Sequence, residues 1–119
     1  MGILIVEDDK LLRETFEGVL RELGYAVASA ENGQKGLEQI RRNRPCFIFI
    51  DLLMPVMNGF ELIDELLTDA ELSKIPIVAM TASWSSKPNG VALMRKPFRA
   101  EAAIDLIRSH CGDPKPPES

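Results

Sequence analysis

Positive charge is in short supply in this chain. Its 119 residues include 14 lysines and arginines against 18 aspartates and glutamates, which gives a formal net charge of −4. The basic residues form no stripe, so nucleic acid is not expected as a direct partner, because nucleic-acid-binding proteins gather such residues on one face. Hydrophobic residues make up 45% of the chain, which is enough for one domain with its own core.

Long apolar runs are also missing. The first run, residues 3–6, is too short for the apolar region of a signal peptide, and three acidic residues follow it directly. No segment approaches the length that crosses a bilayer. We therefore expect no membrane contact and a cytoplasmic location.

Cysteine and histidine are rare. Cys46 and Cys111 are far apart in the sequence and match no metal-ligand spacing, so we expect two reduced thiols in a reducing compartment. The single histidine, His110, lies near the end of the last expected helix, and we expect it outside any site. These scarcities argue against a disulfide scaffold and against a zinc site.

The C-terminal residues differ in composition from the rest. The stretch GDPKPPES contains three prolines and no large apolar side chain. Such a segment cannot contribute to a packed core and is typical of linkers. We expect one folded domain over residues 1–112, followed over residues 113–119 by a disordered tail or the start of a linker.

Short apolar runs alternate with segments of helical periodicity through the remaining chain. Strands are expected at residues 3–6, 25–28, 46–50, 75–80 and 91–94. Helices are expected over residues 10–24, 32–43, 58–69 and 99–111. This alternation predicts an α/β fold with a parallel sheet and helices on both faces.

Polar residues follow four of the five expected strands. They are Glu7, Asp8 and Asp9 after the first strand, Asp51 after the third, Thr81 after the fourth and Lys96 after the fifth. The carboxyl ends of parallel strands share one edge of the sheet, where ligands bind in open α/β folds. Clustered carboxylates suit Mg²⁺, and a carboxylate can accept a phosphoryl group. The set predicts phosphoryl transfer to Asp51, with Lys96 and Thr81 contacting the phosphoryl oxygens.

Four short motifs carry a resemblance to a known family. They are VEDD at 6–9, FIDLLMPVMNG at 49–59, MTA at 80–82 and KPF at 96–98. In this order and spacing, they make the chain similar to the receiver domain of two-component response regulators over about residues 3–111. The resemblance implies a flavodoxin-like (CheY-like) doubly wound five-stranded parallel sheet with strand order 2-1-3-4-5.

The resemblance also implies roles for individual residues. Asp51 matches the phosphoacceptor, which receives its phosphoryl group from a sensor histidine kinase or a phosphotransfer protein. Glu7, Asp8, Asp51 and the backbone carbonyl of Leu53 match the protein ligands of Mg²⁺. Thr81 and Lys96 match the phosphoryl-contacting residues, whereas Asp9 is expected to be peripheral. Such a domain is a signalling switch in a phosphorelay and not an enzyme, although it supports its own phosphorylation and dephosphorylation.

Two features depart from the family pattern. Nine residues, ASWSSKPNG, separate Thr81 from Val91, which is short for a helical crossover, so the family's fourth helix is expected to be absent or reduced to one turn. Leu93 stands where the family often has a Tyr or Phe whose ring rotates on phosphorylation. The usual coupling between phosphorylation and the face that contacts downstream partners is therefore not expected. Trp84 would either cover the exposed core or contact a partner. The family's Lys96–Pro97 bond is typically cis.

Other functions remain open at this point. A phosphorylation-independent protein-interaction module with the same fold would fit the altered output region. An aspartyl phosphohydrolase fits less well, because Leu53 stands where such enzymes need a second acid. A flavin-binding domain is disfavoured, because the acids after the first strand would repel a phosphate. Nothing in the sequence identifies the cognate kinase, the downstream target or the oligomeric state.

Overall fold

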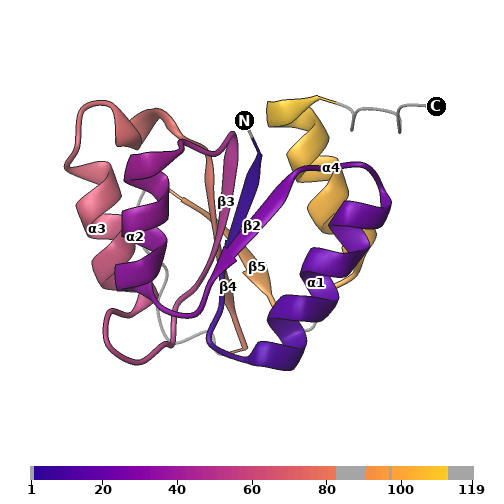
Figure 1. Cartoon of the computed structure of the whole chain (residues 1–119), viewed down its shortest axis with the longest axis horizontal. Helices are drawn as coiled ribbons and strands as arrows, with labels where there is room; N and C mark the ends of the chain where they lie inside the picture. The colour runs from indigo at the N-terminus through magenta and orange to yellow at the C-terminus, as the bar shows by residue number, and fades with distance from the viewer. Residues whose placement is uncertain (1, 83–90, 97, 113–119) are drawn as a thin grey trace.

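A five-stranded parallel sheet forms the centre of the molecule (Figure 1). The computed structural model describes residues 2–82, 91–96 and 98–112. The strands are β1 (Ile3–Val6), β2 (Val27–Ala30), β3 (Phe47–Asp51), β4 (Ile77–Thr81) and β5 (Ala92–Arg95). Their order is β2-β1-β3-β4-β5, which confirms the predicted fold class and strand order.

The register of the strands decides which residues share the carboxyl edge. Val6 pairs with Ile50, Asp51 pairs with Met80, and Thr81 pairs with Arg95. The residues that follow these pairs therefore emerge side by side, as expected for parallel strands. Polar groups from four separate segments of the chain therefore meet at this edge.

Helices cover both faces of the sheet. The helices α2 (Gly33–Arg42) and α3 (Gly59–Leu67) lie on one side, and α1 (Lys10–Glu22) and α4 (Ala100–Cys111) lie on the other (Figure 1). A short 3₁₀ helix, η1 (Leu72–Lys74), precedes β4. The apolar runs in the sequence reflect this arrangement, because both faces of a central strand are buried.

The core consists of two clusters, one on each face of the sheet. In β3, Ile48 and Ile50 belong to the cluster under α2 and α3, whereas Phe47 and Phe49 belong to the cluster under α1 and α4. All four side chains are at most 1% exposed. The third strand is thus a rigid element, held from both sides up to the residue before Asp51.

The helical spacing over residues 10–24 predicts an inward face of Leu12, Phe16, Val19 and Leu23, and this prediction is partly wrong. Phe16 is buried as expected, and its ring lies 4.9 Å from that of Phe49. Leu12 and Leu23 are each 40% exposed, whereas Leu20 is fully buried. The helix rests on the sheet along a line through Phe16 and Leu20, and the helical period brings positions four residues apart onto one face.

The two cysteines form a disulfide bond, which corrects the expectation of reduced thiols. Their Cα atoms are 5.8 Å apart despite a sequence separation of 65 residues. Cys111 is the last residue of α4, and Cys46 immediately precedes β3. The carboxyl end of α4 therefore meets the amino end of the sheet. The sequence spacing contains no sign of this contact.

Several expectations concern residues outside the described ranges. The expected loss or shortening of the family's fourth helix falls on residues 83–90, which also contain Trp84. The expected cis bond between Lys96 and Pro97 and the expected tail at 113–119 also involve residues outside these ranges. The last described helix, α4, ends at Cys111. These expectations stay predictions.

Candidate functional site

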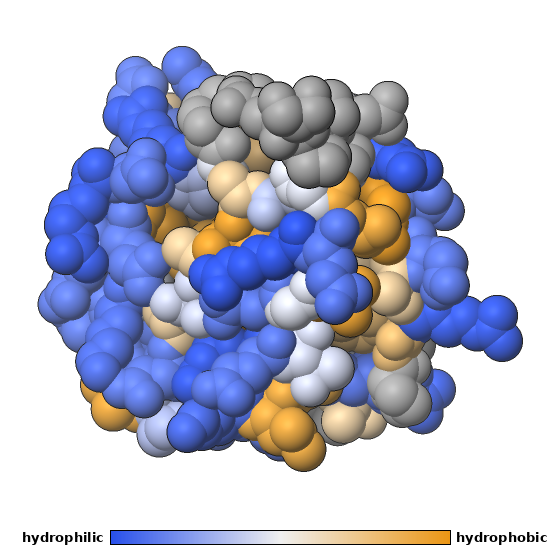
Figure 2. Space-filling view, turned by 45° about the vertical axis from the view of Figure 1, so that its right-hand side comes forward, coloured by the Kyte–Doolittle hydropathy of each residue, from blue (hydrophilic) through white to orange (hydrophobic). Residues whose placement is uncertain are grey.

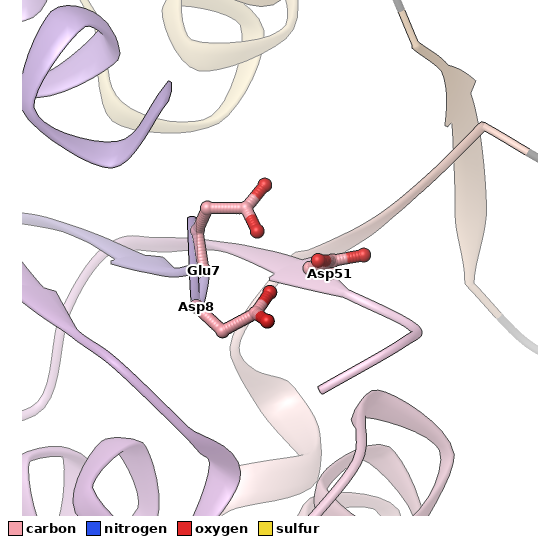
Figure 3. A group of neighbouring side chains, drawn as sticks. All are labelled: Glu7, Asp8 and Asp51. Atoms are coloured by element: carbon pink, nitrogen blue, oxygen red, sulfur yellow. The ribbon is translucent and has the colours of Figure 1, made fainter. Parts of the chain in front are cut away.

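Three carboxylates meet at the carboxyl edge of the sheet. Glu7 and Asp8 follow β1, Asp51 ends β3, and one ligand atom from each lies within 4.8 Å of the others. Figure 3 shows the side chains of Glu7 and Asp8 reaching from one strand toward Asp51 on the next. Glu7 and Asp51 are 1% and 6% exposed, whereas Asp8 is exposed. The trio offers oxygen ligands with one open side, the donor set that Mg²⁺ prefers.

Lys96 supplies the positive charge of the site. Its ammonium group lies 3.4 Å from Oδ2 of Asp51 and forms a close ion pair with Oε1 of Glu7. The backbone N–H of Lys96 donates to the carbonyl oxygen of Thr81 at 2.7 Å, which fixes the residue beside β4. One lysine therefore spans two buried acids that would otherwise repel each other.

The electrostatics of the site are most evident at Glu7. Burial raises the pKa of Glu7 above its usual value of 4.5, and the neighbouring Asp51 carboxylate raises it further. Lys96 acts in the opposite direction without reversing the shift. The buried acids are therefore short of positive charge, and a cation at the open side would stabilise their ionised forms.

The backbone around Asp51 is held by close contacts. The N–H of Leu53 donates to Oδ1 of Asp51 at 3.2 Å, which orients the carboxylate. The N–H of Gly59 donates to the carbonyl of Leu52 at 3.1 Å. A Cβ at Gly59 would lie 2.3 Å from the carbonyl oxygen of Asp51, so this position needs glycine. The start of α3 is therefore pressed against the end of β3.

Arg13 and Asp9 shape the turn that carries the acids. A guanidinium N–H of Arg13 donates to the carbonyl oxygen of Glu7 at 2.8 Å and to that of Asp8 at 3.5 Å. Oδ1 of Asp9 accepts from the N–H of Leu12 at 3.1 Å, so Asp9 is the N-cap of α1 and lies outside the acidic trio. Arg13 could not be predicted as part of the site, because a lysine or arginine in a first helical turn carries no distinctive signal.

Two further residues named from the sequence, Thr81 and Leu93, lie in β4 and β5. Thr81 ends β4 and is 3% exposed. Leu93 lies in β5 and packs, half-buried, against the core under α2 and α3. The structure thus brings Glu7, Asp8, Asp51 and Lys96 into direct proximity and places Thr81 at the same edge.

Comparison with known proteins identifies the family. Residues 3–105 match the model of the response regulator receiver domain. The chain is a receiver domain. It is therefore a signalling protein and not a classical enzyme, in agreement with the expectation from the motifs.

Relatives and solved structures agree with this assignment. The receiver domain is 31% identical to the polar-differentiation response regulator DivK of Brucella anthropi, over 94% of this chain and 97% of that protein. It resembles the signal receiver domain of a signal transduction histidine kinase from Syntrophus aciditrophicus, with a TM-score of 0.83 and 29% identity. That match covers all of this chain and 96% of the other.

A third comparison concerns the metal. The receiver domain of a sensor histidine kinase from Pseudomonas aeruginosa, with a magnesium ion coordinated in its active-site cleft, has a TM-score of 0.82 and 26% identity. The match covers 93% of this chain and 97% of that one. The acidic trio of the present receiver domain is typical of such a site, and it is consistent with a phosphorylation site. Among the helices described, none combines the length and hydrophobicity of a membrane-spanning segment.

Proposed function

We propose that Asp51 accepts a phosphoryl group in the presence of Mg²⁺ and that the domain acts as a switch in a phosphorelay. The observation that carries this proposal is the convergence of Glu7, Asp8, Asp51 and Lys96 at one sheet edge. Family membership makes a sensor histidine kinase or a phosphotransfer protein the natural donor. A cytoplasmic location, typical of response regulators, belongs to the same proposal.

Each residue has a part in the transfer. The Asp51 carboxylate attacks phosphorus, a P–O bond forms, and the bond to the donor breaks. The Lys96 ammonium, now shared with Glu7, moves to a phosphoryl oxygen, and the Thr81 hydroxyl donates to another. Glu7, Asp8, Asp51 and the backbone carbonyl of Leu53 would hold Mg²⁺, which would supply positive charge beside the phosphoryl group. The contact from the Leu53 N–H keeps Asp51 in position for attack.

The surface near the site supports docking of a protein donor. Leu11, Leu53 and Val56 are 76%, 63% and 80% exposed. Leu11 lies in the first turn of α1, and the other two follow β3. Large apolar side chains exposed beside a reactive carboxylate are typical of a contact surface. The face drawn in Figure 2 is largely hydrophilic, with separate hydrophobic patches between polar residues.

Phosphorylation would act by shifting a two-state equilibrium. It adds charge to a buried edge of the sheet, so the contacts of Lys96 and Thr81 must change. Leu93 cannot repeat the swing of an aromatic ring, so the output signal would pass through Thr81 and the residues that follow it. The folded unit comprises residues 1–112 under this proposal, and residues 113–119 form a tail or linker.

Intact mass spectrometry tests the proposal. The wild type, Asp51→Asn and Asp64→Asn are incubated with acetyl phosphate, with and without Mg²⁺. Asp64 is an exposed acid on α3, so its variant matches the change in charge. We expect one added phosphoryl group in the wild type and Asp64→Asn with Mg²⁺, and none in Asp51→Asn.

The alternative function predicts another result. A phosphorylation-independent interaction module would give no adduct, or an adduct that forms equally in Asp51→Asn. Either result would reject Asp51 as the phosphoacceptor. A histidine kinase with a phosphorylated histidine then serves as the second donor, because it tests protein docking as well as chemistry.

A further inference from the structure

The disulfide between Cys46 and Cys111 lies at the amino end of the sheet. Cys46 precedes β3, whose other end carries Asp51, so roughly 16 Å of strand separates the disulfide from the phosphoacceptor. Both cysteines are half-buried. Neither residue is fully enclosed by the core, and the disulfide is remote from the chemistry at Asp51.

Non-covalent contacts hold the same two segments together. The rings of Phe47 and His110 are in edge-to-face contact, with centroids 5.4 Å apart. Ala103 and Ile107 of α4 are fully buried against the sheet. The Tyr25 hydroxyl donates to the carbonyl oxygen of Gly112 at 3.3 Å. These contacts do not need the S–S bond, so the reduced cysteines remain close enough to pair again.

We propose that Cys46 and Cys111 form a reversible thiol–disulfide site, which makes this domain responsive to the cellular thiol pool. Disulfides in cytoplasmic proteins are usually transient or redox-sensing, whereas permanent ones belong to oxidising compartments. The proposal rests on the cytoplasmic location proposed above, and on neither phosphorylation nor metal binding. Its ligand class is the low-molecular-weight thiols and disulfides, such as glutathione.

The exchange is balanced by its own reactants. The thiolate of one cysteine attacks a low-molecular-weight disulfide, forms a mixed disulfide and releases one small thiol. The second cysteine attacks the sulfur of the first, closes the Cys46–Cys111 bond and releases a second small thiol. The cysteines lose two electrons, the small disulfide gains them, and both cysteine protons end on the released thiols. Reduction follows the reverse steps.

The consequence concerns the last turn of α4. Cys111 ends this helix, and Gly112 caps it with a positive φ of 78° and an N–H bond to the carbonyl of Arg108. The disulfide fixes the helix end, and hence the start of the following segment, on the sheet. Reduction leaves that end to the Phe47–His110 and Tyr25–Gly112 contacts. The oxidation state of the two cysteines therefore determines how firmly the carboxyl end of α4 is held on the sheet.

Equilibration in glutathione buffers tests the proposal. The full chain is incubated at several ratios of reduced to oxidised glutathione, quenched by acid and alkylated, and its intact mass is measured. We expect a passage from two alkylated cysteines to none within the ratios that cells maintain. A bond that persists in millimolar reduced glutathione would mark a fixed structural disulfide and overturn the proposal. Thiols that stay free in oxidised glutathione would overturn it equally.

Thermal unfolding provides the second readout. Reduction should lower the Tm of the wild type by about 5 to 15 °C, because opening the loop increases the entropy of the unfolded chain. The Tm of Cys111→Ser should not respond to reductant, and an equal response there would contradict the proposal. Acetyl phosphate should label Asp51 in both redox states. Labelling that fails in both states while the redox transition persists would reject the proposed phosphoacceptor and leave the redox site intact.

Discussion

The ammonium nitrogen of Lys96 lies 3.4 Å from Oδ2 of Asp51 and simultaneously pairs with Glu7. The side chains of the two acids are 8% and 2% exposed, and that of the lysine is 17% exposed. A single cation is therefore shared between two buried carboxylates. An incoming phosphoryl group would compete with Glu7 for this lysine.

Replacing Lys96 should therefore impair phosphorylation. We expect Lys96→Met to be labelled by acetyl phosphate about tenfold or more slowly than the wild type, because a donor to the developing charge is lost. Lys74→Met, a change at an exposed lysine of η1, should have the wild-type rate. The rate comes from a time course of intact mass, with far-UV circular dichroism to verify folding. Equal rates for both variants would remove Lys96 from the mechanism.

Asp8 and Asp9 are neighbours with different tasks. Asp8→Asn should weaken Mg²⁺ binding by more than about tenfold, because the site loses a charged ligand. Asp9→Asn should bind Mg²⁺ nearly as the wild type does, because Asn also serves as an N-cap and Asp9 lies outside the trio. Isothermal titration calorimetry measures both affinities. A similar loss in the two variants would mean that local charge, and not ligation, determines the affinity.

The raised pKa of Glu7 predicts a pH dependence of stability for the metal-free protein. The folded state holds this proton to higher pH than the unfolded state, whose pKa stays near 4.5. Stability should therefore fall as the pH rises from about 4.5 through the raised folded-state pKa. Glu7→Gln cannot ionise, so the wild type should lose stability relative to this variant over that window. Urea unfolding in chelator across this pH range gives the difference, and a constant difference would refute the prediction.

Val56 adopts a backbone conformation that valine rarely tolerates. Its φ is 67° and its side chain is 80% exposed, so no packing compensates for the strain. Val56→Asn should raise the free energy of unfolding by about 1 kcal/mol, because asparagine enters this region more readily. Leu53→Asn, a change at another exposed apolar residue without positive φ, should not stabilise. Urea denaturation tests both, and a destabilised Val56→Asn would contradict the strain argument.

Val56 also tests the docking surface. If its side chain contacts the donor, Val56→Asn should slow transfer from a phosphorylated histidine kinase while leaving acetyl phosphate labelling unchanged. If Val56→Asn is more stable than the wild type but accepts the phosphoryl group more slowly from the protein donor alone, the strained valine trades stability for donor binding. Equal rates with both donors would confine the effect to backbone strain.

Arg13 should act as a positioning residue for the metal site. Arg13→Ala should weaken Mg²⁺ binding several-fold, because the guanidinium group holds the carbonyl of Glu7 and so the turn that carries both acids. Arg21→Ala is the matched control, because Arg21 also projects from α1 and donates to a backbone carbonyl, that of Val27 at 2.9 Å. Calorimetric titration should show an unchanged affinity for the control. Equal affinities in all three proteins would leave Arg13 with a purely structural role.

Much of the fold could be predicted from local pattern. Each buried parallel strand is an uninterrupted apolar run, and β3 begins within one residue of the expected start. The second strand was placed less well, because β2 begins and ends two residues later than the expected range. Its burial is partial, so its hydrophobic pattern is weak. The inward face of α1 was partly misjudged, because the helix offers several leucines and packing selects Leu20 over Leu12 and Leu23.

By itself, the sequence determined the acidic trio and its neighbours. Strand ends are local features, and the parallel topology carries Glu7, Asp51, Thr81 and Lys96 to one edge. The tertiary structure decided the contacts that depend on how helices lie on the sheet. Arg13 reaches the Glu7 carbonyl, and Cys111 reaches Cys46, because the angle and offset of α1 and α4 bring them there. Those offsets result from side-chain packing over the whole core, which no local spacing encodes.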